Sequence, residues 1–255
     1  MSQGQDQQLC VQLFTSARIV TQYTTETQHY RIVYSMALWL GRSERKVRKT
    51  KFVNPSTDLV LLSGRVLDNL LVSEQLHDQL HGDYMEHVQE CLAPHHRKIV
   101  TDWMLEVCQE QECPPQVFLS SVQYLDRVLS QLSIKTKQFQ LLASACLLLS
   151  SKLHDPRPFS LHDLVIYTDC SISVQDLQVM EMTVLKHLRW ELATPTSAEF
   201  LELIFANMGM KNFLSKSQII IIHKHSASLL ALAATEYKYY NIRPSVLVSL
   251  VTYLF

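Results

Sequence analysis

Glycine is scarce in this chain, and its distribution excludes several kinds of site. Only five of the 255 residues are glycine, and none lies between Gly82 and Gly209. Phosphate-cradling loops, sharp nucleophile turns and dinucleotide fingerprints need glycine, because they use positive φ angles or a close backbone approach. No catalytic triad or set of metal ligands is recognisable either. We therefore expect no catalytic residues, no bound metal and no cofactor.

The chain also lacks a charge bias and an ordered cysteine pattern. Its formal net charge is −1 and its pI is about 6.8, so no overall field favours nucleic acid or an anionic membrane. Six irregularly spaced cysteines without a Cys-x-x-Cys motif favour reduced thiols in an intracellular protein. His77 and His81 stand four residues apart, but no third metal ligand follows at a fixed spacing. Solvated histidines are the preferred interpretation.

Long apolar runs are missing as well. A membrane-spanning helix needs about 20 apolar residues. The run Ile32–Leu40 is shorter and is followed by charge. The N-terminal sequence MSQGQDQQ has no basic region leading into an apolar core, so we expect no signal peptide. We predict no membrane association.

The most informative segment that is present is an uncharged run, Gln138–Ser151. It is long enough for a helix of roughly four turns. A helix that is apolar on all sides is buried on all sides, and small residues at 143–145 would let neighbouring helices approach closely. We therefore predict the central helix of an all-helical domain. Its apolar side chains are Phe139, Leu141, Leu142, Ala145, Cys146, Leu147, Leu148 and Leu149.

Prolines and polar caps divide the rest of the chain into further helices. Ser160, Ser173 and Thr196 are expected N-cap residues, each followed three positions later by an acidic residue. No alternation of apolar and polar residues persists, so the fold class is predicted to be all-α. Two short helices are predicted within 59–89, and longer ones cover about 94–111, 116–131, 137–152, 160–168, 173–190, 197–207, 215–236 and 244 onward.

The predicted helices form two similar series. We expect a divergent N-terminal region over 1–58, an N-terminal helical segment over 59–93, a five-helix repeat over 94–193 and an incomplete second repeat over 194–255. The last segment, PSVLVSLVTYLF, would be the second repeat's counterpart of the central helix. Because exposed apolar ends are unfavourable, either the second repeat is truncated there or a partner covers that end.

A basic run lies in the N-terminal region. Six of the ten residues of Arg42–Lys51 are basic. Such a run is found in nuclear import signals and in patches for acidic partners, and it is also common in solvated linkers, which is the interpretation we favour here.

Several charged residues do not fit a plain helical core. Asp126 lies on an otherwise apolar face and needs a partner there, since an uncompensated buried charge costs several kcal/mol. Arg97 is a candidate because its guanidinium can bond a carboxylate bidentately. Arg127 could serve instead, or the charges could reach solvent. Lys152 and Glu181 would extend from rigid helices, either as a preorganised protein contact or as ordinary helix charges.

These residues stand within segments that resemble the cyclin box, specifically that of D-type cyclins. The segments are HRKIVTDWMLEVCQEQ, VQYLDRVL, FQLLASACLLLSSKL, IYTDCSIS and LQVMEMTVLKHLRWELATPTSAEFLE. The likeness covers about 60–255 and is clearest over 96–205. The five family marker positions that match together are Arg97, Asp126, Leu141, Lys152 and Glu181.

The resemblance implies two five-helix cyclin boxes, each with a central third helix, and a role as regulatory subunit. Arg97 and Asp126 would pair inside the first box. Lys152 and Glu181 would hydrogen-bond the backbone of a G1-type cyclin-dependent kinase, with Asp155 facing it nearby. Docking would move a kinase helix inward and open the activation segment. The protein would then promote the G1/S transition without catalysing a reaction itself, in the nucleus and cytoplasm.

The resemblance also implies a second surface, a groove for Arg-x-Leu peptides of substrates or inhibitors. Glu106 would take the arginine of the peptide, Ile99 and Trp103 would take its leucine, and Gln140 would line the groove. His96 stands where the family usually has methionine. A polar imidazole would then replace an apolar side chain at the base of the groove, which would lower the affinity for the peptide.

The chain departs from the D-type pattern in its first 58 residues, which contain no Leu-x-Cys-x-Glu motif for pocket-protein docking. Two alternatives therefore stay open. One is a truncated cyclin that binds a kinase without activating it. The other is a transcription-factor-like helical module. A nucleic-acid module needs a basic face, whereas this box is near neutral, so we expect no nucleic-acid partner.

Overall fold

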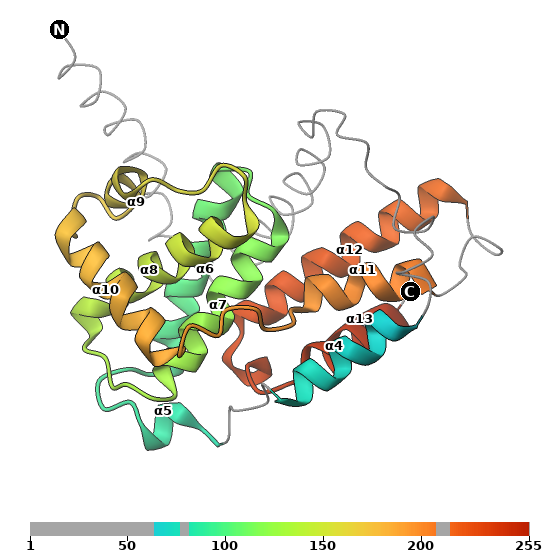
Figure 1. Cartoon of the computed structure of the whole chain (residues 1–255), viewed down its shortest axis with the longest axis horizontal. Coiled ribbons are helices and arrows are strands. Elements are labelled where there is room, and N and C mark those ends of the chain that lie inside the picture. Colours follow the sequence, from blue (N-terminus) through green and yellow to red (C-terminus); the bar gives the residue numbers. More distant parts are fainter. Residues whose placement is uncertain (1–63, 77–81, 208–214, 255) are drawn as a thin grey trace, which may run out of the picture.

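The computed structural model describes residues 64–76, 82–207 and 215–254, and within these ranges it is helical without strands (Figure 1). The predicted all-α class is therefore confirmed. The basic run at 42–51, the region 1–58, and His77 and His81 lie outside the described residues. The helices are α4 (Arg65–Leu76), α5 (Tyr84–His87), α6 (Pro94–Glu110), α7 (Pro115–Leu129), α8 (Thr136–His154), α9 (Leu161–Tyr167), α10 (Val174–His187), α11 (Ser197–Asn207), α12 (Lys216–Thr235), the 3-10 turn η4 (Tyr237–Tyr239) and α13 (Pro244–Tyr253).

Helix α8 is the central helix of the first group, as predicted. Every residue from Leu142 to Ser151 is buried, and the helix packs against α6, α7, α9 and α10. The first turn of α8 and the side chains of Lys152 and Leu153 are exposed. The chain leaves the helix at Asp155, whose backbone is extended. The apolar middle of α8 therefore lies in the core, while its charged C-terminal end lies at the surface.

The predicted caps explain where several helices begin. The hydroxyl of Ser160 accepts a hydrogen bond from the backbone N–H of Asp163 at 3.1 Å, and that of Ser173 accepts one from Asp176 at 3.0 Å. At the start of α11, the Glu199 carboxylate accepts from the N–H of Thr196 at 2.8 Å. These side chains satisfy backbone groups that a helix end leaves without partners.

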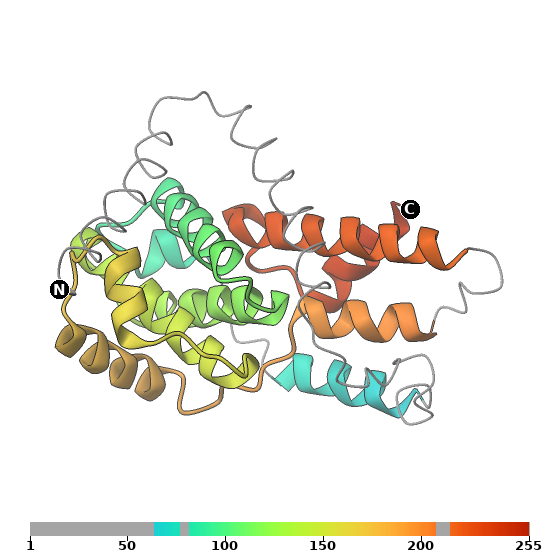
Figure 2. The same ribbon diagram turned by 90° about the horizontal axis from the view of Figure 1, so that it is seen from above.

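A second group of helices consists of α11, α12, α13 and α4 (Figures 1 and 2). Although α4 comes first in the sequence, Leu67, Leu70 and Leu71 pack against the core of this group. The buried Glu74 then accepts hydrogen bonds from the N–H of Ser245 at 2.8 Å and from its hydroxyl at 2.6 Å. Glu74 thus caps the start of α13, and the following α5 returns to the core of the first group.

Two kinds of feature are absent from the described part of the chain. No helix there is long and apolar enough to span a membrane. No group of three or more histidine, cysteine or acidic side chains there is placed to hold a metal ion.

Candidate functional site

The buried ion pair between α6 and α7 is the most extensively bonded charged site among the described residues. The Nε of Arg97 donates to Oδ1 of Asp126 and its Nη2 to Oδ2, both at 2.8 Å. The hydroxyl of Tyr84 donates to the same Oδ1 at 2.7 Å. Both charged side chains are almost fully buried, so neither reaches solvent. Arg127 does not take this role and donates instead to the carbonyl of Glu191 at 2.7 Å.

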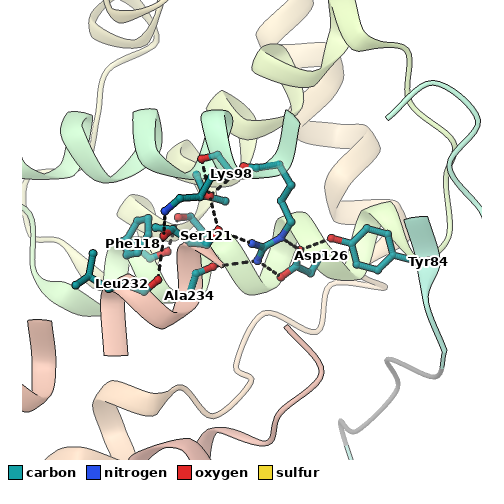
Figure 3. A network of polar contacts seen from close by, with 10 residues as sticks. Tyr84, Lys98, Phe118, Ser121, Asp126, Leu232 and Ala234 are labelled. Atoms are coloured by element: carbon teal, nitrogen blue, oxygen red, sulfur yellow. Dashed lines mark hydrogen bonds and ion pairs between the residues drawn. The ribbon is translucent and has the colours of Figure 1, made fainter. Parts of the chain in front are cut away.

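The same guanidinium also bonds the second helical group. Nη1 of Arg97 donates to the carbonyl of Thr235 at 3.1 Å, and Nη2 donates to that of Ala234 at 3.0 Å (Figure 3). These carbonyls belong to the last turn of α12, where the helix dipole favours a cation. Arg97 therefore joins three helices: its own α6, α7 through Asp126, and the end of α12.

Burial and charge shape the electrostatics of this site. Burial alone would lower the pKa of Arg97, but the charge and hydrogen bonds of Asp126 raise it above the ordinary arginine value. Burial, and next the charge of Asp126, raises the pKa of Tyr84 well above its ordinary value, so its phenol stays a neutral donor. The guanidinium of Arg97 is thus held in its charged form across the physiological pH range.

Lys98 adds a half-buried contact beside the pair. Its Nζ lies 3.0 Å from Asp102 Oδ1, 2.7 Å from the hydroxyl of Thr235 and 3.0 Å from Glu236 Oε1. Burial raises the pKa of Asp102, while the charge of Lys98 opposes that shift. The end of α12 is therefore held by two successive basic residues of α6.

Lys152 and Glu181 meet on the surface at the junction of α8 and α10. Lys152 Nζ donates to Glu181 Oε1 at 2.5 Å, and the two side chains are 48% and 15% exposed. Asp155 lies in the turn after α8, where its Oδ1 accepts from the N–H of Arg157 at 2.8 Å. The structure therefore gathers these three residues at one end of α8, with Lys152 and Glu181 directly bonded to each other.

Apolar side chains lie in the sequence directly beside these charges. Leu153, which follows Lys152, is 49% exposed, and Met182, which follows Glu181, is 45% exposed. Partly exposed apolar groups around a preorganised ion pair are typical of a protein-binding surface.

The predicted peptide groove lies along α6, with Gln140 contributed by α8. Ile99 is 63% exposed and Glu106 is exposed. Trp103 is partly buried against the core, and its Nε1–H donates to the carbonyl of Tyr167 at 3.3 Å. Gln140 Oε1 accepts from the hydroxyl of Ser171 at 3.5 Å. Ile99, Trp103 and Glu106 thus share one helix face, on which the tryptophan ring is fixed and the isoleucine is accessible.

His96 has a local role that the sequence did not indicate. Its Nδ1 accepts a hydrogen bond from the N–H of Ala93 at 3.0 Å, which ties the ring to the start of α6. The ring also lies against His95, with centroids 3.9 Å apart. The imidazole is therefore engaged with its own helix terminus.

A half-open cavity of about 140 Å³ lies between the two helical groups. It is bordered by α7, the segment before α11, and the chain from the end of α12 to the start of α13, with Arg97 and Asp126 in its wall. Neither Lys152, Glu181 nor the predicted groove residues border it. The cavity therefore belongs to the joint between the groups and not to the predicted binding surfaces.

Sequence reasoning missed the residues that complete the ion-pair site. Tyr84 and the carbonyls of Ala234 and Thr235 lie 42 or more positions from their partners and carry no local motif. One signal was available in the sequence. A guanidinium has five N–H donors, and the one carboxylate expected beside a buried Arg97 cannot accept from all of them, so further acceptors were required.

The chain matches one protein-family model and is similar to curated proteins. The family model described as "Cyclin, N-terminal domain" matches residues 65–193, about half of the chain. G1/S-specific cyclin-D3 of Bos taurus is 39% identical over 183 residues, which are 72% of this chain and 61% of the relative. G1/S-specific cyclin-D2 of Rattus norvegicus is 37% identical over 190 residues, which are 74% of this chain and 64% of the relative.

A solved structure shares the fold. The X-ray structure of a viral cyclin from herpesvirus saimiri superposes with a TM-score of 0.64 at 22% sequence identity, covering 74% of this chain and 80% of that one. The chain spans less than two thirds of the length of the two curated relatives above.

Proposed function

Because the chain belongs to the cyclin family, we propose that it is a non-catalytic regulatory subunit that binds and activates a G1-class cyclin-dependent protein kinase. Activation of that kinase would promote the G1/S transition. The names of the D-type relatives, which are G1/S-specific cyclins, support this assignment. The proposed places of action are the nucleus and the cytoplasm.

The observation that carries the proposal is the Lys152–Glu181 pair at the end of α8 and on α10. One ammonium hydrogen of Lys152 is used by Glu181, so two donors remain for carbonyls of a partner backbone. Oε2 of Glu181 can accept a partner N–H while Oε1 keeps the lysine. The pair can therefore stay closed while the kinase binds, which lowers the entropic cost of ordering two long side chains.

The apolar surroundings would supply the affinity that the charges cannot. An exposed ion pair contributes only about 0–1 kcal/mol by itself. Burying Leu153 and Met182 under a partner would contribute about 1.5–3 kcal/mol for each fully covered side chain. The charges would then set the orientation of the kinase, and the apolar contacts would set much of the dissociation rate.

The test is binding of the purified full chain to G1-class kinases, followed by phosphorylation of a pocket-protein substrate. We expect Lys152→Ala and Glu181→Ala to reduce association at least about tenfold, since truncating one partner of a desolvated charge pair costs about 2–5 kcal/mol. Lys135→Ala, at the opposite end of α8 and exposed, is the matched control and should bind as the wild type. Unchanged kinase binding in both site variants would refute the site assignment.

Binding and activation are separate readouts, and they distinguish the proposal from its alternatives. A chain that binds the kinase without raising substrate phosphorylation is the non-activating cyclin. A chain that binds no kinase but retains duplex DNA in a salt-dependent manner is the transcription-factor-like module.

We also propose that the α6 face with Ile99, Trp103 and Glu106 binds Arg-x-Leu peptides. Exposed Ile99 beside the fixed ring of Trp103 supports an apolar contact, and Glu106 supplies the negative charge for arginine. Fluorescence polarisation with a labelled Arg-x-Leu peptide should show weaker binding for Ile99→Ser, whose exposed side chain leaves folding unaffected. A peptide with the arginine replaced by citrulline is the matched neutral control.

A further inference from the structure

Arg127 is a nearly buried arginine with one unused edge of its guanidinium. Its side chain is 10% exposed, and its Nη1 donates to the carbonyl of Glu191 at 2.7 Å. Its Nε and Nη2 make no hydrogen bond within the described part of the chain, and the half-exposed carboxylate of Glu191 comes only to 4.0 Å from Nη2. A buried charge without a close partner is costly, so this edge requires an acceptor.

Arg97 shows how the same edge is satisfied on the neighbouring helix. Its Nε and Nη2 bond the two carboxylate oxygens of Asp126, both at 2.8 Å. The Nε and Nη2 of Arg127 form the same fork, which binds carboxylate or phosphate oxygens bidentately. Burial lowers the pKa of Arg127, and the charge of Glu191 opposes this shift only in part. Arg127 therefore lacks the full compensation that Arg97 receives from Asp126.

Both arginines border the cavity between the two helical groups. The charged residues in its wall are three arginines, one aspartate and one glutamate, so the wall carries one excess positive charge. The two acids already have partners, since Asp126 bonds Arg97 and Glu74 bonds Ser245. The third arginine is Arg243, which is exposed. An anion in the cavity would balance the remaining positive charge.

Further donors surround the same space. Tyr239 and Asn241 border the cavity, and neither side chain hydrogen-bonds another residue of the described chain. The start of α13, at Arg243 and Pro244, also borders it, and a helix start favours an anion. A cavity of about 140 Å³ holds several water molecules, so a tetrahedral oxyanion fits in the same space.

We propose that this cavity binds a phosphate-type oxyanion, held bidentately by Nε and Nη2 of Arg127. Arg243, Asn241 and Tyr239 would contact its remaining oxygens. The ligand is either free phosphate or the phosphoryl group of a phosphorylated peptide, because both present the same oxygens to the arginine. Once bound, it would join α7 of the first helical group to the chain between α12 and α13 of the second, and so stabilise the folded protein. This site shares no residue with the Lys152–Glu181 surface, so kinase binding does not test it.

Thermal unfolding of the full chain in increasing inorganic phosphate, at constant ionic strength, tests the site. Phosphate also stabilises proteins by exclusion from their surface, so the saturable part of the rise in melting temperature is the measure. Arg127→Lys keeps the charge but loses the fork, and we expect its half-saturating phosphate concentration to be at least about tenfold higher.

Two exposed positions supply a second variant and a control. Asn241→Asp places a negative charge beside the cavity without removing a buried contact, so it should also raise the half-saturating concentration and should do so even where Arg127→Lys disturbs folding. Arg157→Gln removes one positive charge from an exposed position outside the cavity wall and should respond as the wild type.

The same titration with a short phosphoserine peptide identifies the source of the oxyanion. Saturation at lower concentration than with inorganic phosphate assigns the site to a phosphorylated peptide, and saturation at equal or higher concentration assigns it to the free ion. Both results support the site when Arg127→Lys or Asn241→Asp weakens them. A wild type without a saturable rise for either probe overturns the proposal. Equal half-saturating concentrations in the wild type, Arg127→Lys and Asn241→Asp do so as well, because they place the bound phosphate elsewhere.

Discussion

Replacing Arg97 by methionine should cost a large part of the stability of the protein. Met fills a similar volume but removes both bonds to Asp126 and both bonds to the carbonyls of Thr235 and Ala234. Asp126 would remain buried with only Tyr84 as a partner. Removing one member of a buried pair costs about 3–5 kcal/mol. A bare carbonyl costs about 1–3 kcal/mol where water cannot reach it, so we expect a loss of about 4 kcal/mol.

Equilibrium urea unfolding, followed by circular dichroism, measures this loss. The stabilising effect of Arg97 is fully present below the ordinary arginine pKa and is lost only as pH rises through the raised pKa of the folded state. A measurement at neutral pH therefore captures all of it. Arg157→Met is the matched control, because Arg157 is exposed, and its effect should stay within about 0.5 kcal/mol.

A second variant identifies the cause of the loss. Asp126→Leu combined with Arg97→Met removes the stranded carboxylate, so the double variant should be more stable than the sum of the single changes predicts, by about 1–3 kcal/mol. A loss below about 1 kcal/mol for Arg97→Met, or strict additivity in the double variant, would refute the role assigned to the pair.

Three further predictions concern other parts of the structure. Glu74→Gln should lower the free energy of unfolding by about 1–2 kcal/mol, because the charged cap on Ser245 is lost. Thermal melting measures this loss, and Glu90→Gln, at an exposed position, is the control. Burial lowers the pKa of His154 below 6.5, so the unfolded chain binds its proton more readily, and stability should fall as pH drops below about 6.5. His154→Gln should flatten this part of the stability profile, and an unchanged slope would contradict the assignment. Iodoacetamide should alkylate exposed Cys91 and Cys170 much faster than buried Cys108, Cys113 and Cys146. Peptide mass spectrometry of a time course would detect any departure from that order.

The helices of this protein were predictable because their signals are local. The apolar run that predicted a helix over 137–152 forms one over Thr136–His154, and the expected caps at Ser160 and Ser173 are present. One predicted end was too late: the helix starting near 173 was extended to Trp190 but ends at His187. Arg189 and Trp190 have positive φ angles of 51° and 63°, so the chain turns although its side chains continue the apolar pattern.

That turn also qualifies what a shortage of glycine implies. Five non-glycine residues of the described chain have positive φ, among them Glu112, Asp169 and Cys170. A left-handed conformation costs such residues roughly 1–2 kcal/mol each, and helix-end hydrogen bonds such as that from the N–H of Trp190 to the carbonyl of Leu185 at 3.0 Å offset it. The shortage of glycine therefore did not prevent tight helix ends.

The contacts between distant segments could not be read from the sequence. The bonds from Arg97 to the end of α12 span 137 and 138 positions, and the bond from Ser245 to Glu74 spans 171. No local pattern encodes such a pairing, because it depends on how the packed helices place their ends. The same holds for the direct bond between Lys152 and Glu181: their helices were predicted, but their meeting was not.

The hydrogen bonds from Arg97 to the end of α12 have a practical consequence for the design of shorter fragments of this chain. A fragment ending near residue 193 would retain most of the first core but lose the two carbonyls that accept hydrogen bonds from Arg97. Tyr84 would also lose the rings of Tyr237 and Tyr240 that pack edge-on against it. Such a fragment would unfold at lower temperature than the intact chain. In an interaction screen, weak binding by that fragment would then reflect a loosened scaffold and not a missing contact residue.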